Sequence, residues 1–249
     1  MTRIVQPHPT LAARSLSRLV LVALVALLLA ASVADAALTT SACLVSKRKV
    51  WGNFRKCQGT EQVKQIKGKP ADLATCDTAL QTALGKITAK ATKAVIPCRY
   101  GDNGDGTVTD YDTGLQWEKK DGEVGGVCLL LPNVVSHCVN FIYTWDQAQS
   151  FVSPVSTDGT TVPSFLAGSA DWRLPTVVEL RTILLKPFPC GTSPCIDPVF
   201  SPTAVGNYWS ATTNATLPSD AWYVFFSSGF VDGNNKDING YVRAVRAGL

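Results

Sequence analysis

The chain has 249 residues, which is enough for one large domain or two smaller ones. Its formal net charge of +4 hides an asymmetry, because residues 37–99 carry 12 Lys and Arg against 3 Asp and Glu, whereas residues 100–249 carry 8 against 15. This asymmetry predicts two oppositely charged modules. Zinc centres and His-dependent nucleophilic triads are disfavoured, because only His137 lies beyond the N-terminal segment and no cysteine pair has CxxC spacing.

The first 36 residues are predicted to be a secretory signal peptide. Arg3, Arg14 and Arg18 precede an uninterrupted apolar run over residues 19–31, and small residues stand at Ala34 and Ala36, where a signal peptidase reads the chain. The apolar run is shorter than the roughly 20 residues that a membrane-spanning helix needs. We therefore expect cleavage after residue 36 and an exported protein, periplasmic, surface-bound or secreted, with no permanent membrane anchor.

Residues 37–98 are predicted to form a basic α-helical hairpin. Apolar side chains recur at helical spacing up to a break at Gly68-Lys69-Pro70. Asp72 can then cap a second helix, whose apolar positions continue at spacings of three and four to Ala94. Two amphipathic helices joined by one short break fold into an antiparallel pair. Such a hairpin has little core of its own and needs covalent support.

All eight cysteines follow the predicted cleavage site, and an even number of cysteines in an exported chain is typical of disulfides. Folding the hairpin about residue 68 favours two nested bridges over the other two connectivities of its four cysteines. The remaining four cysteines are expected to pair locally and to pin two loops. The expected pairs are Cys43–Cys98, Cys57–Cys76, Cys128–Cys138 and Cys190–Cys195.

Residues 99–249 are predicted to form an α+β domain. Helical periodicity ends near Cys98, and short β-prone runs then alternate with Gly, Asn, Asp and Thr. Two helices are expected among the strands, one over 144–152 and one from Thr176 to about residue 185. In the second, Glu179 follows Thr176 by three residues, which is the spacing of a capping box.

Most aromatic and basic side chains of this domain are interpreted as structural. Four tryptophans each lie in a short apolar run or in one of the sequence motifs given in the next paragraph, so core packing is favoured over the stacking of sugar rings: Trp117, Trp172, Trp209 and Trp222. Three arginines are expected to bind carboxylates or backbone carbonyls in the interior: Arg173, Arg243 and Arg246.

An ordered set of motifs runs through the second module: Asp102–Asp110, Thr113–Trp117, Thr144–Ala148, Asp171–Thr176 with Glu179-Leu180, Ile196–Pro198 with Phe200, Tyr208–Thr213, Ala221–Val224 and Tyr241–Arg246. In order and number these motifs resemble the Lcl C-terminal domain family, named after a bacterial collagen-like adhesin. The resemblance implies a C-type-lectin-like fold and a place among exported proteins. In the adhesin, the domain is associated with adhesion and with binding of sulfated polysaccharide.

The chain departs from that adhesin in two ways. It has no Gly-X-Y stalk, so the trimer that such a stalk forms is not implied. Its lectin-like module is acidic, which opposes attraction to a sulfated polymer, so the basic hairpin is the better candidate for contact with a polyanion. The alternative is that the basic face of the hairpin binds no polyanion and is either solvated or docked on the acidic module.

Two Asp-rich segments are candidate binding sites. Asp102, Asp105 and Asp110 offer oxygens of the kind that calcium prefers, although the Asn-Gly and Asp-Gly pairs between them also predict a tight turn without metal. In a lectin-like fold, loops near the last two strands often hold ligands or calcium, so the resemblance makes the loop between those strands a candidate site, with a plain turn as the default interpretation. That loop offers Asp232, Asn234, Asn235, Asp237 and Asn239. No other cofactor is expected.

No catalytic constellation is found in the sequence. The Arg173-Leu-Pro-Thr176 element resembles the formylglycine-generating oxidases, but their copper chemistry needs a late cysteine pair, and no cysteine follows Cys195. We predict a non-catalytic binding or adhesion module that recognises a polysaccharide or cell-surface partner, with oligomers allowed and no nucleic-acid partner. A structural component of the cell envelope that uses the basic hairpin is the alternative, and an oxidase-like enzyme is the remote one.

Overall fold

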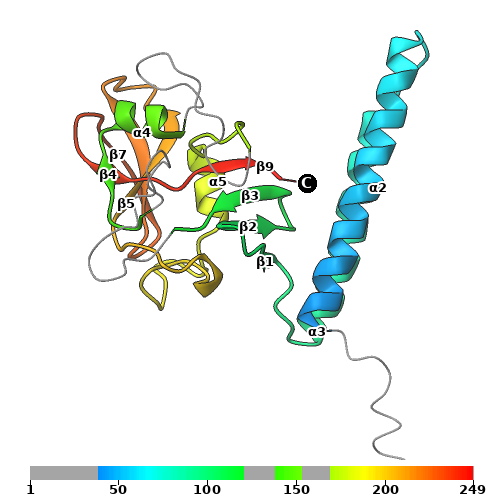
Figure 1. The fold of residues 1–249 in the computed structure, drawn as a ribbon, viewed down its shortest axis with the longest axis horizontal. Coiled ribbons are helices and arrows are strands. Elements are labelled where there is room, and N and C mark those ends of the chain that lie inside the picture. Colours follow the sequence, from blue (N-terminus) through cyan, green and yellow to red (C-terminus); the bar gives the residue numbers. More distant parts are fainter. Residues whose placement is uncertain (1–38, 121–137, 153–168, 249) are drawn as a thin grey trace, which may run out of the picture. The chain divides into compact units, whose positions relative to one another are not determined.

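The computed structural model describes residues 39–120, 138–152 and 169–248 (Figure 1). The chain divides into two units, Met1–Thr39 and Thr40–Leu249, and every helix and strand described belongs to the second. The predicted signal peptide lies outside the described residues, as do Cys128 and His137. Within the described ranges, no helix has both the length and the apolarity that a bilayer crossing requires.

The predicted hairpin is confirmed. Helix α2 spans Thr40–Ile66 and helix α3 spans Leu73–Lys93, and the two pack along each other. Gly68 turns the chain with a φ of +65°, a left-handed conformation that glycine adopts without strain. Asp72 caps α3 as expected, because its carboxylate accepts a hydrogen bond of 3.0 Å from the backbone N–H of Thr75.

Three predicted disulfides are confirmed. Cys43–Cys98 and Cys57–Cys76 are the nested pair of the hairpin, and Cys190–Cys195 closes a short loop of the domain. Cys138 is also disulfide-bonded, whereas its predicted partner lies outside the described residues. No described cysteine is free.

The core of the hairpin is small and lies toward its open end. Trp51 of α2 packs with Leu80 and Leu84 of α3 and with a tyrosine of the next module, Tyr111. At the far end, the helical spacing of apolar residues does not produce burial. Val63 is 46% exposed and Ile66 is 85% exposed, because neither helix supplies a cover there. The apolar pattern therefore predicted the helix correctly, but it did not predict how far along α2 the apolar side chains are buried.

The module after residue 98 has two sheets, as expected of an α+β domain. The first has the order β1-β2-β3-β9 and is antiparallel throughout. Because the last strand pairs with β3, the two ends of the module lie in one sheet. Its strands are β1 Tyr100–Asp102, β2 Thr107–Asp110, β3 Leu115–Glu118 and β9 Val245–Ala247.

The second sheet has the order β4-β8-β5-β6-β7, with a parallel β5–β8 pair and antiparallel neighbours elsewhere. Strand β7 forms one edge, drawn in orange in Figure 1. The strands are β4 Ile142–Tyr143, β5 Asn207–Thr213, β6 Asp220–Phe225, β7 Phe230–Asn235 and β8 Gly240–Tyr241.

Two α-helices and a 3₁₀ turn cover these sheets: α4 Trp145–Val152, α5 Val177–Thr182 and η1 Pro198–Phe200. Helix α4 packs against β5, and helix α5 packs against β5 and β6. The predicted capping box at the start of α5 is present, since Thr176 and Glu179 each accept a hydrogen bond from the other's backbone N–H.

The interior is built largely from the residues expected there. Trp117, Trp172 and Trp209 are buried, whereas Trp222 is only half-buried. Arg243 is fully buried and donates a 2.6 Å hydrogen bond to the backbone carbonyl of Glu118. Arg246 also binds a carboxylate, that of Asp171 at 2.8 Å, but the side chain of Asp171 is 55% exposed, so this pair lies near the surface and not in the predicted interior.

The predicted interior position is wrong for Arg173, because this arginine binds a carboxylate at the surface. Its side chain is 48% exposed and holds Glu179 through two hydrogen bonds of 2.7 and 2.8 Å.

We expect Glu179→Gln to remove this ion pair while keeping the capping box, since glutamine also serves at that position. The hydrogen bond from Arg173 lowers the pKa of Glu179, so its contribution to stability is present above the unfolded-state pKa and is lost as the pH falls through the lower folded-state pKa. Loss of the pair should reduce the free energy of unfolding by about 1 kcal/mol at pH 7. Urea unfolding at pH 7 and at acidic pH checks this, because the difference between the two proteins should shrink as the pH falls through the lowered pKa of Glu179; a constant difference contradicts it.

Candidate functional site

The structure does not bring the three carboxylates of the first Asp-rich segment together. Asp110 is fully buried and accepts hydrogen bonds of 3.1 and 2.8 Å from Arg99. Asp102 pairs with Lys119, and Asp105 accepts hydrogen bonds within its own turn. In the described parts of the chain, no group of three or more His, Cys, Asp or Glu is arranged to hold a metal ion. The segment forms the tight β1–β2 hairpin that was the alternative expectation.

The second Asp-rich segment is not the loop that was expected. Asp232, Asn234 and Asn235 lie in strand β7, and only Asp237 and Asn239 follow in the turn before β8. Side chains alternate between the two faces of a strand, so Asp232 and Asn234 share one face while Asn235 points to the other. The structure therefore separates the five predicted residues into a pair on a sheet face and three residues at the strand's end.

The register of β6 and β7 places aromatic rings beside this pair. Tyr223 lies directly opposite Asp232, and Phe225 lies directly opposite Phe230. Residues paired across antiparallel strands project to the same side of the sheet. We call this set the aromatic face: Tyr223, Phe225, Phe230, Asp232 and Asn234. Phe230 is 61% exposed and Phe225 is 36% exposed, so these two rings reach solvent, whereas Tyr223 is half-buried against a core cluster that includes Trp209.

Tyr223 is the best-supported ring of the aromatic face. It packs edge-on against the buried indole of Trp209, with ring centroids 6.3 Å apart. Partial burial raises the pKa of Tyr223, and the negative charge of Asp232 raises it further. The phenol therefore remains a neutral hydrogen-bond donor next to a carboxylate. This arrangement presents a donor, an acceptor and an apolar surface side by side.

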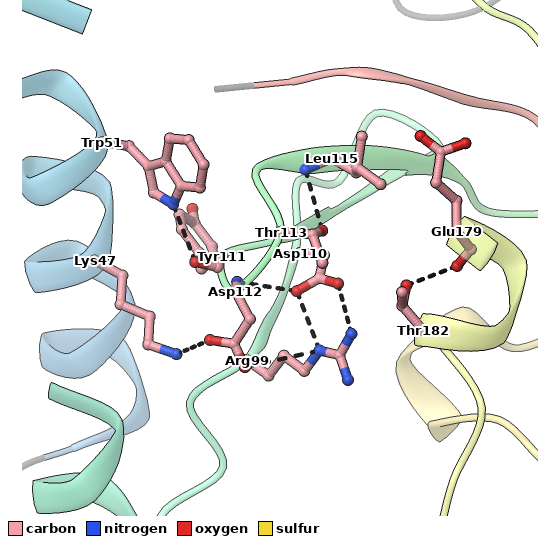
Figure 2. Close-up of polar contacts among 10 residues, drawn as sticks. All are labelled: Lys47, Trp51, Arg99, Asp110, Tyr111, Asp112, Thr113, Leu115, Glu179 and Thr182. Carbon is pink, nitrogen blue, oxygen red and sulfur yellow. Dashed lines mark hydrogen bonds and ion pairs between the residues drawn. The ribbon is translucent and has the colours of Figure 1, made fainter. Parts of the chain in front are cut away.

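A second arrangement joins the hairpin to the first sheet (Figure 2). Lys47 of α2 is fully buried and forms an ion pair with Asp112 in the β2–β3 turn. One turn later, the indole N–H of Trp51 donates a 3.0 Å hydrogen bond to the backbone carbonyl of Tyr111. The Tyr111 hydroxyl in turn accepts a 2.9 Å hydrogen bond from Arg48. One ion pair and two side-chain hydrogen bonds therefore hold α2 against the β2–β3 turn.

The same turn depends on a close approach of its backbone to the hairpin. Gly114 has a φ of +75°, and a Cβ added there would collide with the indole of Trp51. The backbone N–H of Asp112 donates a 3.0 Å hydrogen bond to the carboxylate of Asp110, which links the ion pair of Lys47 to that of Arg99. Figure 2 shows these two ion pairs as one continuous polar chain.

A groove of about 800 Å³ lies beside this junction, between the open end of the hairpin and the domain. Its volume falls in the range of small-molecule sites, which is about 300–1,000 Å³. Arg99 and Asp112 are already engaged in ion pairs, so little net charge is left for a charged ligand. The groove is lined by Thr40, Pro97, Cys98, Arg99, Tyr100, Asp112, Thr113, Thr182, Leu184, Leu185, Lys186, Asp197 and Val199.

Sequence reasoning missed both the aromatic rings and the groove. The identity of Phe225 and Phe230 carries no binding signal, because apolar residues in a predicted strand are normally interpreted as core. The groove brings together segments that lie far apart along the chain, so no local pattern describes it. The nearest signal to the aromatic face was the Asp and Asn content of β7.

A family model described as the Lcl C-terminal domain matches residues 106–246, which is more than half of the chain. The chain belongs to the Lcl C-terminal domain family. A comparison with curated proteins finds none that matches it. The Lcl C-terminal domain contains the whole aromatic face, whereas helices α2 and α3 lie outside the matched residues.

Proposed function

We propose that this protein is an exported, non-catalytic binding module whose Lcl C-terminal domain recognises a polysaccharide through the aromatic face. The observation that carries the proposal is the strand register, which sets Tyr223 beside Asp232 and Phe225 beside Phe230 on one side of β6 and β7, where the two phenylalanines are exposed. The disulfides support export, because such bonds persist in oxidising compartments. We assign a C-type-lectin-like fold to the domain as part of the same proposal, on the strength of its family.

The chemistry of the aromatic face suits a sugar polymer. Aromatic rings present broad apolar surfaces, and a sugar ring has C–H groups on the side that lies against such a surface. The carboxylate of Asp232 accepts hydrogen bonds from hydroxyl groups, and the amide of Asn234 both donates and accepts. Because residues 100–249 carry an excess of acidic groups, a neutral chain fits this surface better than a sulfated one.

Phe230→Ala tests the proposal. The ligand would cover the ring of Phe230, so removal of this ring should weaken binding by about tenfold. The fold should be retained, because Phe230 lies at the surface. A glycan array with neutral and sulfated polysaccharides finds the ligand, and calorimetry on the strongest neutral hit measures the change. Val178→Ala is the matched control, since Val178 is 69% exposed on α5, outside the aromatic face.

Two results count against the proposal. One is silence of the wild-type protein both on the array and in pull-down from envelope extract. The other is unchanged affinity of Phe230→Ala for a glycan that the wild-type protein binds.

A structural role in the cell envelope is the second candidate. The observation that favours it is the opposite charge of the two modules, which lets the basic hairpin of one copy approach the acidic domain of another. Oligomers that dissociate at high salt in sedimentation experiments would favour this candidate over polysaccharide binding.

A further inference from the structure

The surface of the hairpin is strongly cationic. Eight Lys and Arg side chains on or beside its two helices are exposed and form no ion pair or hydrogen bond with another described residue: Lys49, Arg55, Lys56, Lys67, Lys69, Lys86, Lys90 and Lys93. Only two exposed acidic residues, Asp72 and Asp77, accompany them on the hairpin. Lys86, Lys90 and Lys93 follow at spacings of four and three, so they form a row along one side of α3.

Two exposed apolar side chains lie at the turn end of this cationic hairpin. Ile66 is 85% exposed and Val63 is 46% exposed in the last turn of α2. Lys67 and Lys69 follow immediately in the turn and are exposed as well. Two apolar side chains at the extreme end of a helix pair are therefore bordered by ammonium groups on long, flexible stems.

The end of the hairpin is held by hydrogen bonds and a disulfide. Glu61 accepts a 2.6 Å hydrogen bond from Lys64 and a 2.9 Å hydrogen bond from the backbone N–H of Asp72, so its charge is already engaged. The Cys57–Cys76 disulfide joins the two helices behind it. The exposed apolar pair is thus held in place rather than free to fold back onto a core.

We propose that the end of the hairpin docks reversibly on the surface of an anionic lipid bilayer. Ile66 and Val63 enter the boundary between headgroups and acyl chains, and Lys67 and Lys69 extend their ammonium groups to lipid phosphates. Basic residues near an anionic leaflet each add to the attraction. The association is peripheral, because none of the described helices is apolar enough to span the bilayer.

The combination of features selects a bilayer among anionic partners. An acidic polysaccharide would attract the lysines but offers no continuous apolar medium to the tip of Ile66, and an acidic protein surface offers apolar atoms only in patches among polar ones. A bilayer interface offers phosphate and hydrocarbon within one side-chain length of each other. This inference concerns α2 and α3 and does not depend on polysaccharide binding by the Lcl C-terminal domain.

Co-sedimentation of the exported, processed protein with vesicles tests the inference. We expect binding to vesicles of phosphatidylcholine with phosphatidylglycerol, and at least tenfold weaker binding to phosphatidylcholine alone. Ile66→Ser should weaken binding to the anionic vesicles by about tenfold, and the pair Lys67→Glu with Lys69→Glu should abolish it. Matched controls on the domain are Val178→Ser and Lys186→Glu, which should bind as the wild-type protein does, since both residues are exposed and lie far along the chain from the hairpin.

Three outcomes overturn the inference. Equal binding to both vesicle types removes the role of lipid charge. Unchanged binding of Ile66→Ser reduces the contact to simple charge attraction and removes the bilayer as the selected partner. Salt-sensitive sedimentation without vesicles, with no increase when they are added, identifies a second copy as the partner instead. Near-ultraviolet circular dichroism of each variant confirms that the fold is intact.

Discussion

Replacing both Cys43 and Cys98 with serine lowers the free energy of unfolding of the hairpin by about 4 kcal/mol, which is the largest effect we expect from any one bond in the protein. The two cysteines are 55 residues apart, and a cross-link that closes a long loop removes much conformational freedom from the unfolded chain. The hairpin depends on this entropic stabilisation by the disulfide, because its own core is built around only three side chains of the two helices: Trp51, Leu80 and Leu84.

Denaturant unfolding followed by far-ultraviolet circular dichroism measures this loss, because α2 and α3 are the longest helices described. Two shorter loops supply a graded control. The same model expects a loss of about 3 kcal/mol without Cys57–Cys76, which are 19 residues apart, and about 2 kcal/mol without Cys190–Cys195, which are 5 apart. Equal losses for all three pairs would show that loop entropy does not govern the stability of this protein.

Replacing Asp112 with alanine should cost about 3 kcal/mol, because it leaves the fully buried ammonium group of Lys47 without its partner. The expected value is at the lower end of the usual range, since Asp112 itself is 37% exposed and water can reach the site it vacates. Lys47→Met is the matched comparison. It removes the charge and keeps a side chain of similar length, so we expect a change below about 1 kcal/mol.

The two variants are compared by urea unfolding at neutral pH. A smaller loss for Asp112→Ala than for Lys47→Met would contradict the burial argument and would indicate that Lys47 acts mainly through packing. The double variant adds a check, because the ammonium group and its partner are then both absent. Its stability should return to that of Lys47→Met alone.

The hairpin and its bridges could be predicted from the sequence because their signals are local. A Gly-Pro break, the Asp72 cap and apolar spacing set the two helices, and the position of the break then decides which cysteines face each other. The capping box at Thr176 and Glu179 is equally local. The division into a helical and an α+β part followed from the same changes of pattern.

Features that depend on strand register or on tertiary cover could not be predicted in this way. Asp232 and Asn234 were expected in a loop, because Asp, Asn and Gly are poor strand formers, yet pairing with β6 overrides that preference. The aromatic neighbours of Asp232 depend on which residue of β6 lies opposite it. Burial of Lys47 and exposure of Ile66 are likewise decided by what lies against α2, which its periodicity does not record.

The position of β7 at the margin of the five-stranded sheet has a consequence for solubility. A margin of this kind presents unpaired amide and carbonyl groups that a strand of another molecule can join, and natural proteins resist such growth with charged and strand-breaking residues. The Asp-Gly-Asn-Asn sequence of β7 has this composition. The polar content of the strand thus guards the protein against fibrillar aggregation, while one side of the strand still carries the ring of Phe230.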